Sequence, residues 1–165
     1  MKKYIKYIVI FLVIAIATGC NLFDKNEKTY SSKGITVTMK DDFYEKTNIA
    51  HTLYLESSDV IFLADKESFS MLEEYFDIDK DSTLDEYEEI IKTVNQFDDD
   101  FKKDENLVYT TYERSVENND YFYLMSIYKS DDAFWLVNFA CLKEDKDKYE
   151  SNFIKWAKTV KFDNQ

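Results

Sequence analysis

Three long runs of β-branched and aromatic residues near the carboxyl end constrain the fold of this chain most strongly. They cover residues 107–116, 121–129 and 133–142, and the polar breaks ENND and SDD separate them. Breaks of this length and composition are typical of hairpins, so the runs predict three consecutive antiparallel strands. The last run, AFWLVNFACL, is apolar at odd and even positions alike. Such a strand is expected in the centre of a sheet that is covered on both faces.

Shorter β-like patterns lie outside these runs. Apolar and polar residues alternate over 35–40, which predicts a half-buried strand, and two further β-like runs occupy 51–56 and 59–64. Residues 160–162 predict a short edge strand, whereas the charged segment 98–106 predicts a loop.

Helical periodicity occupies the remaining segments. Apolar residues three and four apart predict helices over 69–76, 84–97 and 148–160. Two pairs fit the capping box that begins a helix, Thr83 with Glu86 and Asp147 with Glu150. Together the elements predict an α+β fold with a twisted antiparallel sheet flanked by helices.

The order of these elements resembles the PsbP-like family over residues 34–163. The resemblance is carried by the start GITVTMKDDFYEK, the helix TLDEYEEIIK, the two hairpins and the end FWLVNFACLKEDKDKYESNFIKWAKTVKF. The family often has a proline and a tryptophan after the first strand, and Lys40–Phe43 departs from that pattern. The resemblance implies an α/β/α sandwich and a surface module without transferable catalytic residues.

The first twenty residues resemble the leader of a bacterial lipoprotein. Lysines precede an apolar run, and the small residues Ala17, Thr18 and Gly19 precede Cys20. The pattern predicts a signal peptide over 1–19 and a diacylglycerol thioether on Cys20. Residues 20–33 then form a lipidated flexible tether, and 34–165 form one domain. This arrangement places the protein at the cell membrane, lipid-anchored on the extracytoplasmic face.

Composition excludes several classes of function. The formal net charge is −12, so nucleic acid is a poor partner, because phosphate binding needs a basic surface. Beyond the leader the chain has one glycine, Gly34, and no proline, which excludes glycine-rich phosphate loops and nucleophile elbows. The single histidine, His51, is expected to be a satisfied structural residue, and Cys141 a buried apolar one.

An acidic segment between the first two helices fits a calcium-binding loop. Asp77, Asp79 and Asp81 stand at positions 1, 3 and 5 of an EF-hand-like loop at 77–88, and Glu88 stands at position 12. Ser82 replaces the glycine that this loop normally has at position 6. The alternative is an ordinary solvated connection between two helices, with no cofactor.

Tyrosines form a second candidate surface. Tyr121 and Tyr123 share one face of their predicted strand, and Tyr109 and Tyr112 lie on the neighbouring strand. Exposed rings would bind a sugar, a peptide or a wall polymer, whereas buried rings would only pack within the sheet. The only arginine, Arg114, is expected to pair with a neighbouring acid.

These observations favour a non-enzymatic, membrane-anchored module with an unknown protein, peptide or cell-envelope ligand. A calcium-binding lipoprotein is the alternative, and its ligands would be Asp77, Asp79, Asp81 and Glu88. A hydrolase that uses two converging carboxylates is a third possibility among the 33 acidic residues.

Overall fold

The computed structural model describes residues 26–48 and 50–163. Its strands are β1 (Glu27–Ser32), β2 (Ile35–Lys40), β3 (Tyr44–Glu45), β4 (Leu53–Glu56), β5 (Val60–Ser68), β6 (Lys102–Asp104), β7 (Leu107–Val116), β8 (Asn119–Lys129), β9 (Ala133–Leu142) and β10 (Lys161–Phe162). Its helices are α2 (Phe69–Phe76), α3 (Leu84–Asn95), the short 3-10 turn η1 (Lys143–Asp145) and α4 (Lys146–Ala157).

The strands form two antiparallel sheets. The larger has seven strands in the order β3-β4-β5-β9-β8-β7-β6, and the smaller has three in the order β1-β2-β10. β9 lies in the middle of the larger sheet, and seven of its residues, distributed over both faces, are less than 5% exposed. The predicted central strand is therefore confirmed. The smaller sheet buries Ile35, Val37 and Met39 of β2.

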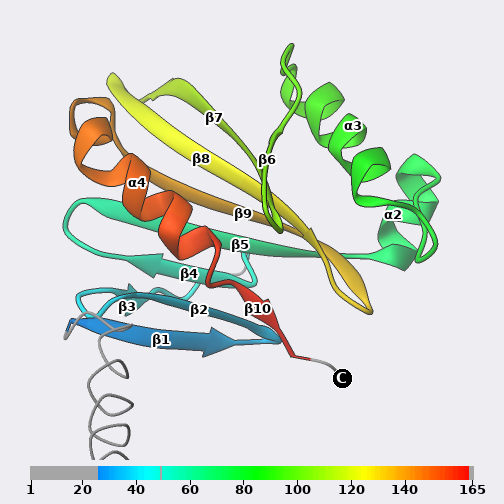
Figure 1. Cartoon of the computed structure of the whole chain (residues 1–165), viewed down its shortest axis with the longest axis horizontal. Coiled ribbons are helices and arrows are strands. Elements are labelled where there is room, and N and C mark those ends of the chain that lie inside the picture. The colour runs from blue at the N-terminus through cyan, green and yellow to red at the C-terminus, as the bar shows by residue number, and fades with distance from the viewer. Residues whose placement is uncertain (1–25, 49, 164–165) are drawn as a thin grey trace, which may run out of the picture.

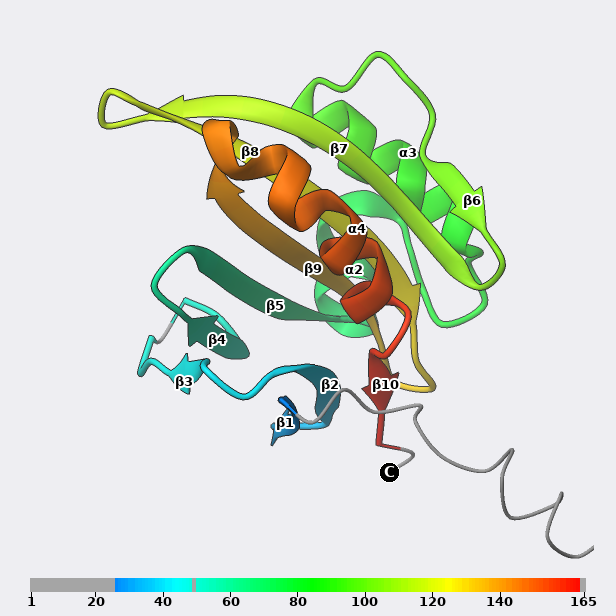
Figure 2. The same cartoon turned by 60° about the vertical axis from the view of Figure 1, so that its left-hand side comes forward.

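Helices cover both faces of the larger sheet (Figures 1 and 2). On one face α4 packs Phe153 and Trp156 against Phe139 of β9. On the other face α2 and α3 cover β9 with Leu72 and Tyr87, and the Tyr87 ring stacks on Phe134 at a centroid distance of 4.5 Å. The expected α+β class, an antiparallel sheet flanked by helices, is therefore confirmed.

The helix starts follow the sequence in one case and depart from it in another. Thr83 and Glu86 form the predicted capping box of α3, in which each side chain accepts the backbone N–H of the other residue. The cap predicted from Asp147 and Glu150 is wrong. α4 begins at Lys146, directly after η1, and Asp145 at its N-cap has φ −93° and ψ 3° instead of an extended backbone. Its side chain makes no capping hydrogen bond.

The tether was expected to extend from residue 20 to residue 33, but residues 27–32 form β1. This strand pairs with β2 from Glu27 opposite Lys40 to Ser32 opposite Ile35. Lys33 and Gly34 make the tight turn with φ values of +49° and +93°. β1 is an edge strand with only Tyr30 buried, so its residues show no alternating pattern. The folded domain therefore begins at residue 27 and not at 34.

Two short strands, β3 and β6, were not predicted from the sequence. β6 lies within the segment 98–106 that was expected to be a loop, and β3 follows β2. The remaining strands and helices lie where they were predicted, with boundaries shifted by a few residues, and β10 pairs with β2 as an edge strand. None of the helices in the described part of the chain is long and apolar enough to cross a membrane. The predicted leader and Cys20 lie outside the described residues.

Candidate functional site

The acidic segment between α2 and α3 is a tight turn built from its own hydrogen bonds. Asp77 ends α2 in the left-handed conformation, with φ +58°. The Asp79 carboxylate accepts the backbone N–H groups of Asp81 at 2.8 Å and Ser82 at 3.0 Å, and these bonds lower the pKa of Asp79. The Asp79 carboxylate thus acts as the acceptor that closes the turn.

Glu88 has its hydrogen-bond partner outside this turn. Its side chain is buried, at 5% exposure, and Oε1 accepts the backbone N–H of Phe101 at 2.8 Å. The structure therefore does not bring Glu88 together with Asp77, Asp79 and Asp81. Across residues 26–48 and 50–163, no group of three or more His, Cys, Asp or Glu side chains is arranged to hold a metal ion.

His51 and Cys141 have the structural roles expected of them. His51 Nδ1 lies 2.9 Å from the Asp65 carboxylate and the ring packs edge-on against Tyr54. Cys141 is 1% exposed within β9, and burial raises the pKa of its thiol to about 11. Such a thiol is protonated and unreactive near neutral pH.

The face of the larger sheet that α2 and α3 cover is only partly occupied by them. Along β8, Met125 and Ile127 are buried beneath α3, whereas Tyr121 and Tyr123 on the same face remain half-buried. In Figure 1, α2 and α3 gather toward one end of the long strands, and neither extends to the β7–β8 hairpin. The uncovered end of this face is therefore accessible from solvent.

Aromatic rings line this uncovered end. The rings of Tyr112 and Tyr123 stack with centroids 4.8 Å apart and an interplanar angle of 3°, and Tyr121 lies 6.2 Å from Tyr123. Arg114 lies over Tyr112, with its Cζ 5.6 Å from the ring centroid. Burial raises the pKa of Tyr112 to about 12. We call Tyr112, Arg114, Tyr121 and Tyr123 the tyrosine face.

Two details differ from the sequence expectations. Tyr109, which was grouped with these rings, is buried in the cluster on the α4 side of the sheet. Arg114 contacts an aromatic ring, and none of the ion pairs within the described residues includes it, so the expected pairing with an acid is wrong. Register explains both outcomes, because Tyr112 is opposite Tyr123, Arg114 is opposite Tyr121, and Tyr109 is opposite the buried Ser126.

The tyrosine face continues across the sheet toward β4. Half-buried residues on this side of the neighbouring strands extend it, namely Tyr54, Ile61, Leu63, Asn138 and Leu142. No sequence pattern marked Ile61, Leu63 or Asn138, because the strands that carry them become neighbours only in the folded sheet.

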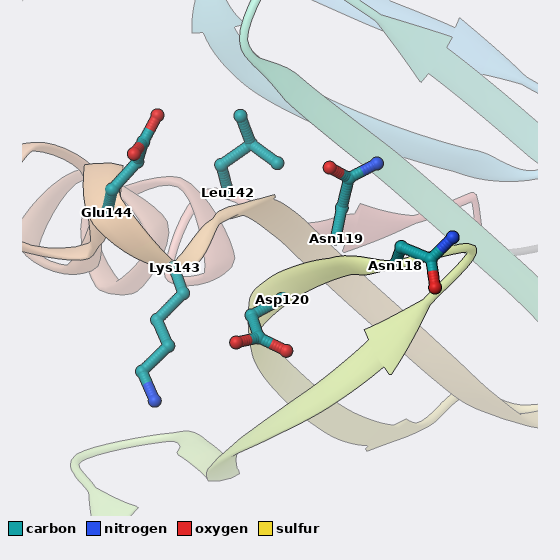
Figure 3. A pocket seen from close by; sticks show the side chains of 6 residues that line it. All are labelled: Asn118, Asn119, Asp120, Leu142, Lys143 and Glu144. Atoms are coloured by element: carbon teal, nitrogen blue, oxygen red, sulfur yellow. The ribbon is translucent and has the colours of Figure 1, made fainter.

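An open hollow lies at the end of the sheet beside the tyrosine face. It measures about 540 Å³ and is lined by Asn118, Asn119, Asp120, Leu142, Lys143 and Glu144. Figure 3 shows Asp120 and Lys143 directed to one side of the hollow and Asn119 and Leu142 to the other. A neighbouring hollow of about 350 Å³ shares Asn119 and Leu142 and reaches Tyr121 and the β4–β5 turn.

The β4–β5 turn is fixed to α4 by one carboxylate. Asp59 accepts hydrogen bonds from Lys148 Nζ at 2.8 Å and the Tyr149 hydroxyl at 2.7 Å. These bonds hold the pKa of Asp59 at about 2. The rim of the hollow of about 350 Å³ is therefore polar where Asp59 lies, and the ion pair with Lys148 holds it against α4.

Comparison with known proteins concerns the fold. No protein family and no curated protein matches the sequence. A crystal structure of a protein from Bacteroides thetaiotaomicron VPI-5482 is similar, with a TM-score of 0.54 and 14% identity over 85% of this chain. This chain spans half the length of that one. The solution structure of cyanobacterial PsbP from Synechocystis sp. PCC 6803 aligns with a TM-score of 0.49 and 11% identity, covering 88% of this chain and 98% of that one.

Two glutamates beneath α2 and α3 have structural partners. Glu88 is buried and Glu67 is half-buried, and the carboxylate of each accepts a hydrogen bond from a neighbouring residue. Glu67 accepts from the Tyr87 hydroxyl at 2.8 Å, and Glu88 accepts from the Phe101 N–H. A pair of converging carboxylates, which glycoside hydrolysis requires, is thus not formed by these two residues.

Proposed function

We propose that this chain is an extracytoplasmic lipoprotein, anchored through Cys20, that acts as a non-enzymatic binding module with the tyrosine face as its binding surface. The observation that carries the proposal is the sheet face that α2 and α3 leave uncovered, where Tyr121 and Tyr123 remain half-buried beside the stacked Tyr112. Half-exposed tyrosines supply apolar contact area and a hydroxyl donor together, which suits recognition of a polymer or another protein.

The shape of the surface supports an extended ligand. Pockets for small molecules enclose most of the ligand and are lined mainly by apolar groups. Here the hollow of about 540 Å³ is open, and it is lined by polar side chains such as Asn118, Asn119 and Lys143. A peptide or a wall polymer can lie across such a surface, with aromatic contacts on the tyrosine face and hydrogen bonds at the rim.

The anchor is supported by the leader pattern, in which Cys20 follows three small residues. A diacylglycerol thioether would retain the protein at the membrane, since two acyl chains give stable anchoring. The acidic chain has little attraction for anionic lipids, because its formal net charge over all 165 residues is −12.

Site-specific crosslinking in intact cells tests the proposed surface. A photoreactive amino acid replaces Tyr121 in the full-length protein, and we expect a discrete crosslinked product. Tyr75 on α2 is the matched control position, because its ring is 69% exposed but lies outside the tyrosine face. The product at position 121 should weaken when Tyr112 and Tyr123 are both changed to Ser.

Two outcomes would contradict the proposal. Equal products at positions 121 and 75 would show that the tyrosine face has no preference for the ligand. Turnover of any substrate in a broad hydrolase panel by the purified protein would contradict the non-enzymatic assignment.

A further inference from the structure

We propose that the open edge of β7, residues 111–115, binds an extended peptide segment of another protein, which adds to the sheet as a further strand and carries lysine or arginine. This inference rests on the proposed binding function and names its partner class. It is carried by an observation separate from the tyrosine rings, the unpaired backbone along β7.

β7 is far longer than the strand that protects it. β6 covers only Leu107 to Tyr109, whereas on its other side β7 pairs with β8 as far as Val116. Proteins commonly blunt the edge of a sheet with short strands, prolines or covering segments. β3 and β6 are short in this way, but β7 continues beyond β6 and the chain has no proline.

The register identifies which backbone groups face outward. Two-residue turns close both hairpins, so Asp104 pairs with Leu107 and Val116 pairs with Asn119. The closing pair of such a hairpin is hydrogen-bonded, and the bonding direction alternates along an antiparallel strand. The N–H and C=O groups of Thr111, Glu113 and Ser115 therefore point away from β8, and within the described residues no backbone bond outside the ladders reaches them.

The side chains along this edge indicate how an added strand would be read. On one face its side chains would lie beside Tyr112, whose ring also contacts Phe97 at 5.0 Å. On the other face they would lie beside Glu113, whose side chain is 42% exposed although Lys143 pairs with it at 2.7 Å. Apolar and basic side chains at alternate positions would match these two faces.

Charge favours a foreign peptide over a second copy of this chain. Each copy carries a formal net charge of −12, so association of two copies brings like charges together. Glu113 at this edge and Glu117 in the adjoining turn are both exposed, and the exposed Arg114 between them lies over the Tyr112 ring. A segment with lysine or arginine would be attracted by the same field that repels another copy.

The test begins with selection from a library of random peptides long enough to span residues 111–115, against the full-length protein in detergent micelles. We expect enriched peptides that carry Lys or Arg and alternate with apolar residues. Their binding should slow hydrogen exchange at the amides of Thr111, Glu113 and Ser115. N-methylation of alternate backbone amides in the peptide should abolish binding to the unaltered protein.

Ser115→Pro provides the matching change in the protein. It removes an outward N–H and no backbone bond to β8, although the hydrogen bond that the Ser115 hydroxyl donates to Asp120 is lost with the side chain. Binding should weaken about tenfold or more. Ser31→Pro is the control, since Ser31 lies on β1, which is also an edge strand, and its N–H points outward by the same register argument. The control should bind the peptides as the unaltered protein does.

Each other result overturns the inference. Absence of enriched peptides, selection of acidic peptides, or unchanged exchange at the three amides would each do so. A dimer seen by light scattering and lost in Ser115→Pro would assign the edge to a second copy. Crosslinking at position 121 that is normal in cells with Ser115→Pro but lost when Tyr112 and Tyr123 are changed to Ser would reject strand addition. The proposed function of the tyrosine face would then still stand.

Discussion

The Glu88 carboxylate illustrates how a residue with the spacing of a metal ligand can serve the fold. It is buried and accepts the Phe101 N–H at 2.8 Å. We expect Glu88→Ala to lower the free energy of unfolding by about 1–3 kcal/mol, because the Phe101 N–H would lose its acceptor. Glu88→Gln keeps an acceptor and should lower it less. Urea unfolding of the three proteins measures these differences.

The same measurement in millimolar calcium separates the structural role from the calcium hypothesis. With Glu88 bonded to Phe101, we expect calcium to leave all three unfolding curves unchanged. A calcium-dependent gain in stability that Glu88→Gln abolishes would instead show that the loop rearranges to bind the ion.

Glu67 gives a pH dependence of known sign. Burial raises its pKa above the ordinary value of 4.5, and the hydrogen bond from the Tyr87 hydroxyl opposes the rise. Because the folded state binds the proton more tightly, stability is highest with Glu67 protonated and falls as pH rises from 4.5 through the raised pKa. Glu67→Gln lacks this loss, so it should gain stability relative to the unaltered protein toward neutral pH. Melting temperatures across this pH range, with Glu73→Gln on exposed α2 as the control, test the sign.

Sequence reasoning succeeded at residues whose role is local. The Thr83–Glu86 capping box needs only a spacing of three, and Cys141 lies within an unbroken apolar run. It failed at Arg114 and left Glu88 ambiguous, because their partners are set by folding. Glu88 depends on Phe101 after the end of α3, and Arg114 faces Tyr112 through the register of β7. A glutamate that binds a metal and a glutamate that accepts a backbone N–H in the core cannot be told apart by their spacing in the sequence.

At the level of elements, β1 makes residues 27–32 part of the domain. Tyr30 is 7% exposed, its hydroxyl donates to the Lys40 carbonyl at 2.8 Å, and it accepts the Phe43 N–H at 3.2 Å. We expect Tyr30→Ala to lower the free energy of unfolding by about 3 kcal/mol and Tyr30→Phe by about 1 kcal/mol. The exposed neighbour Ser31→Ala should have little effect. If all three changes were neutral in chemical denaturation, the segment would be the flexible tether that its composition suggests.

The contact between the β4–β5 turn and α4 should respond to acid. The pKa of Asp59 is about 2 in the folded protein, against an ordinary value of 3.8. A lowered pKa means that the stabilisation is present above 3.8 and is lost as pH falls toward 2. Asp59→Asn removes the titrating group, so its stability should fall less over that interval. A parallel acid titration of both proteins by circular dichroism would contradict this view if their curves had the same slope.

Long elements were predictable and edge elements were not. β7, β8, β9 and α3 each bury a repeated pattern, so hydrophobic periodicity locates them within a few residues. β1, β3 and β6 bury few side chains and are held mainly by backbone pairing, which leaves no periodic signal in the sequence. The open edge of β7 could not be predicted from the sequence for the same reason, because it exists only where the pairing with β6 ends.

For the whole molecule, the proposed anchor and the proposed binding edge lie on opposite sides. The described chain begins at Asn26, whose carbonyl accepts the Asp41 N–H at 2.8 Å at the end of β2. Figures 1 and 2 place β1 on one side of the molecule and β7 with α3 on the other. Since β1 begins at Glu27, only residues 21–26 separate the fold from Cys20, a reach of at most about 24 Å. The domain would therefore lie close to the lipid surface, with the open edge of β7 directed away from the membrane.

Spin labels on the two sides test this orientation. A nitroxide on Asp42→Cys, beside the first described residues, should be relaxed by a paramagnetic metal held on lipid headgroups in vesicles. A nitroxide on Val94→Cys of α3, which is 59% exposed, should be affected far less. Cys141 is buried and its thiol has a raised pKa, so it should not take up the label. Adding Cys20→Ser should release the protein and remove the effect at position 42. Equal relaxation at positions 42 and 94 would show that the domain lies on its side or tumbles freely, and the binding edge would then have no preferred direction relative to the membrane.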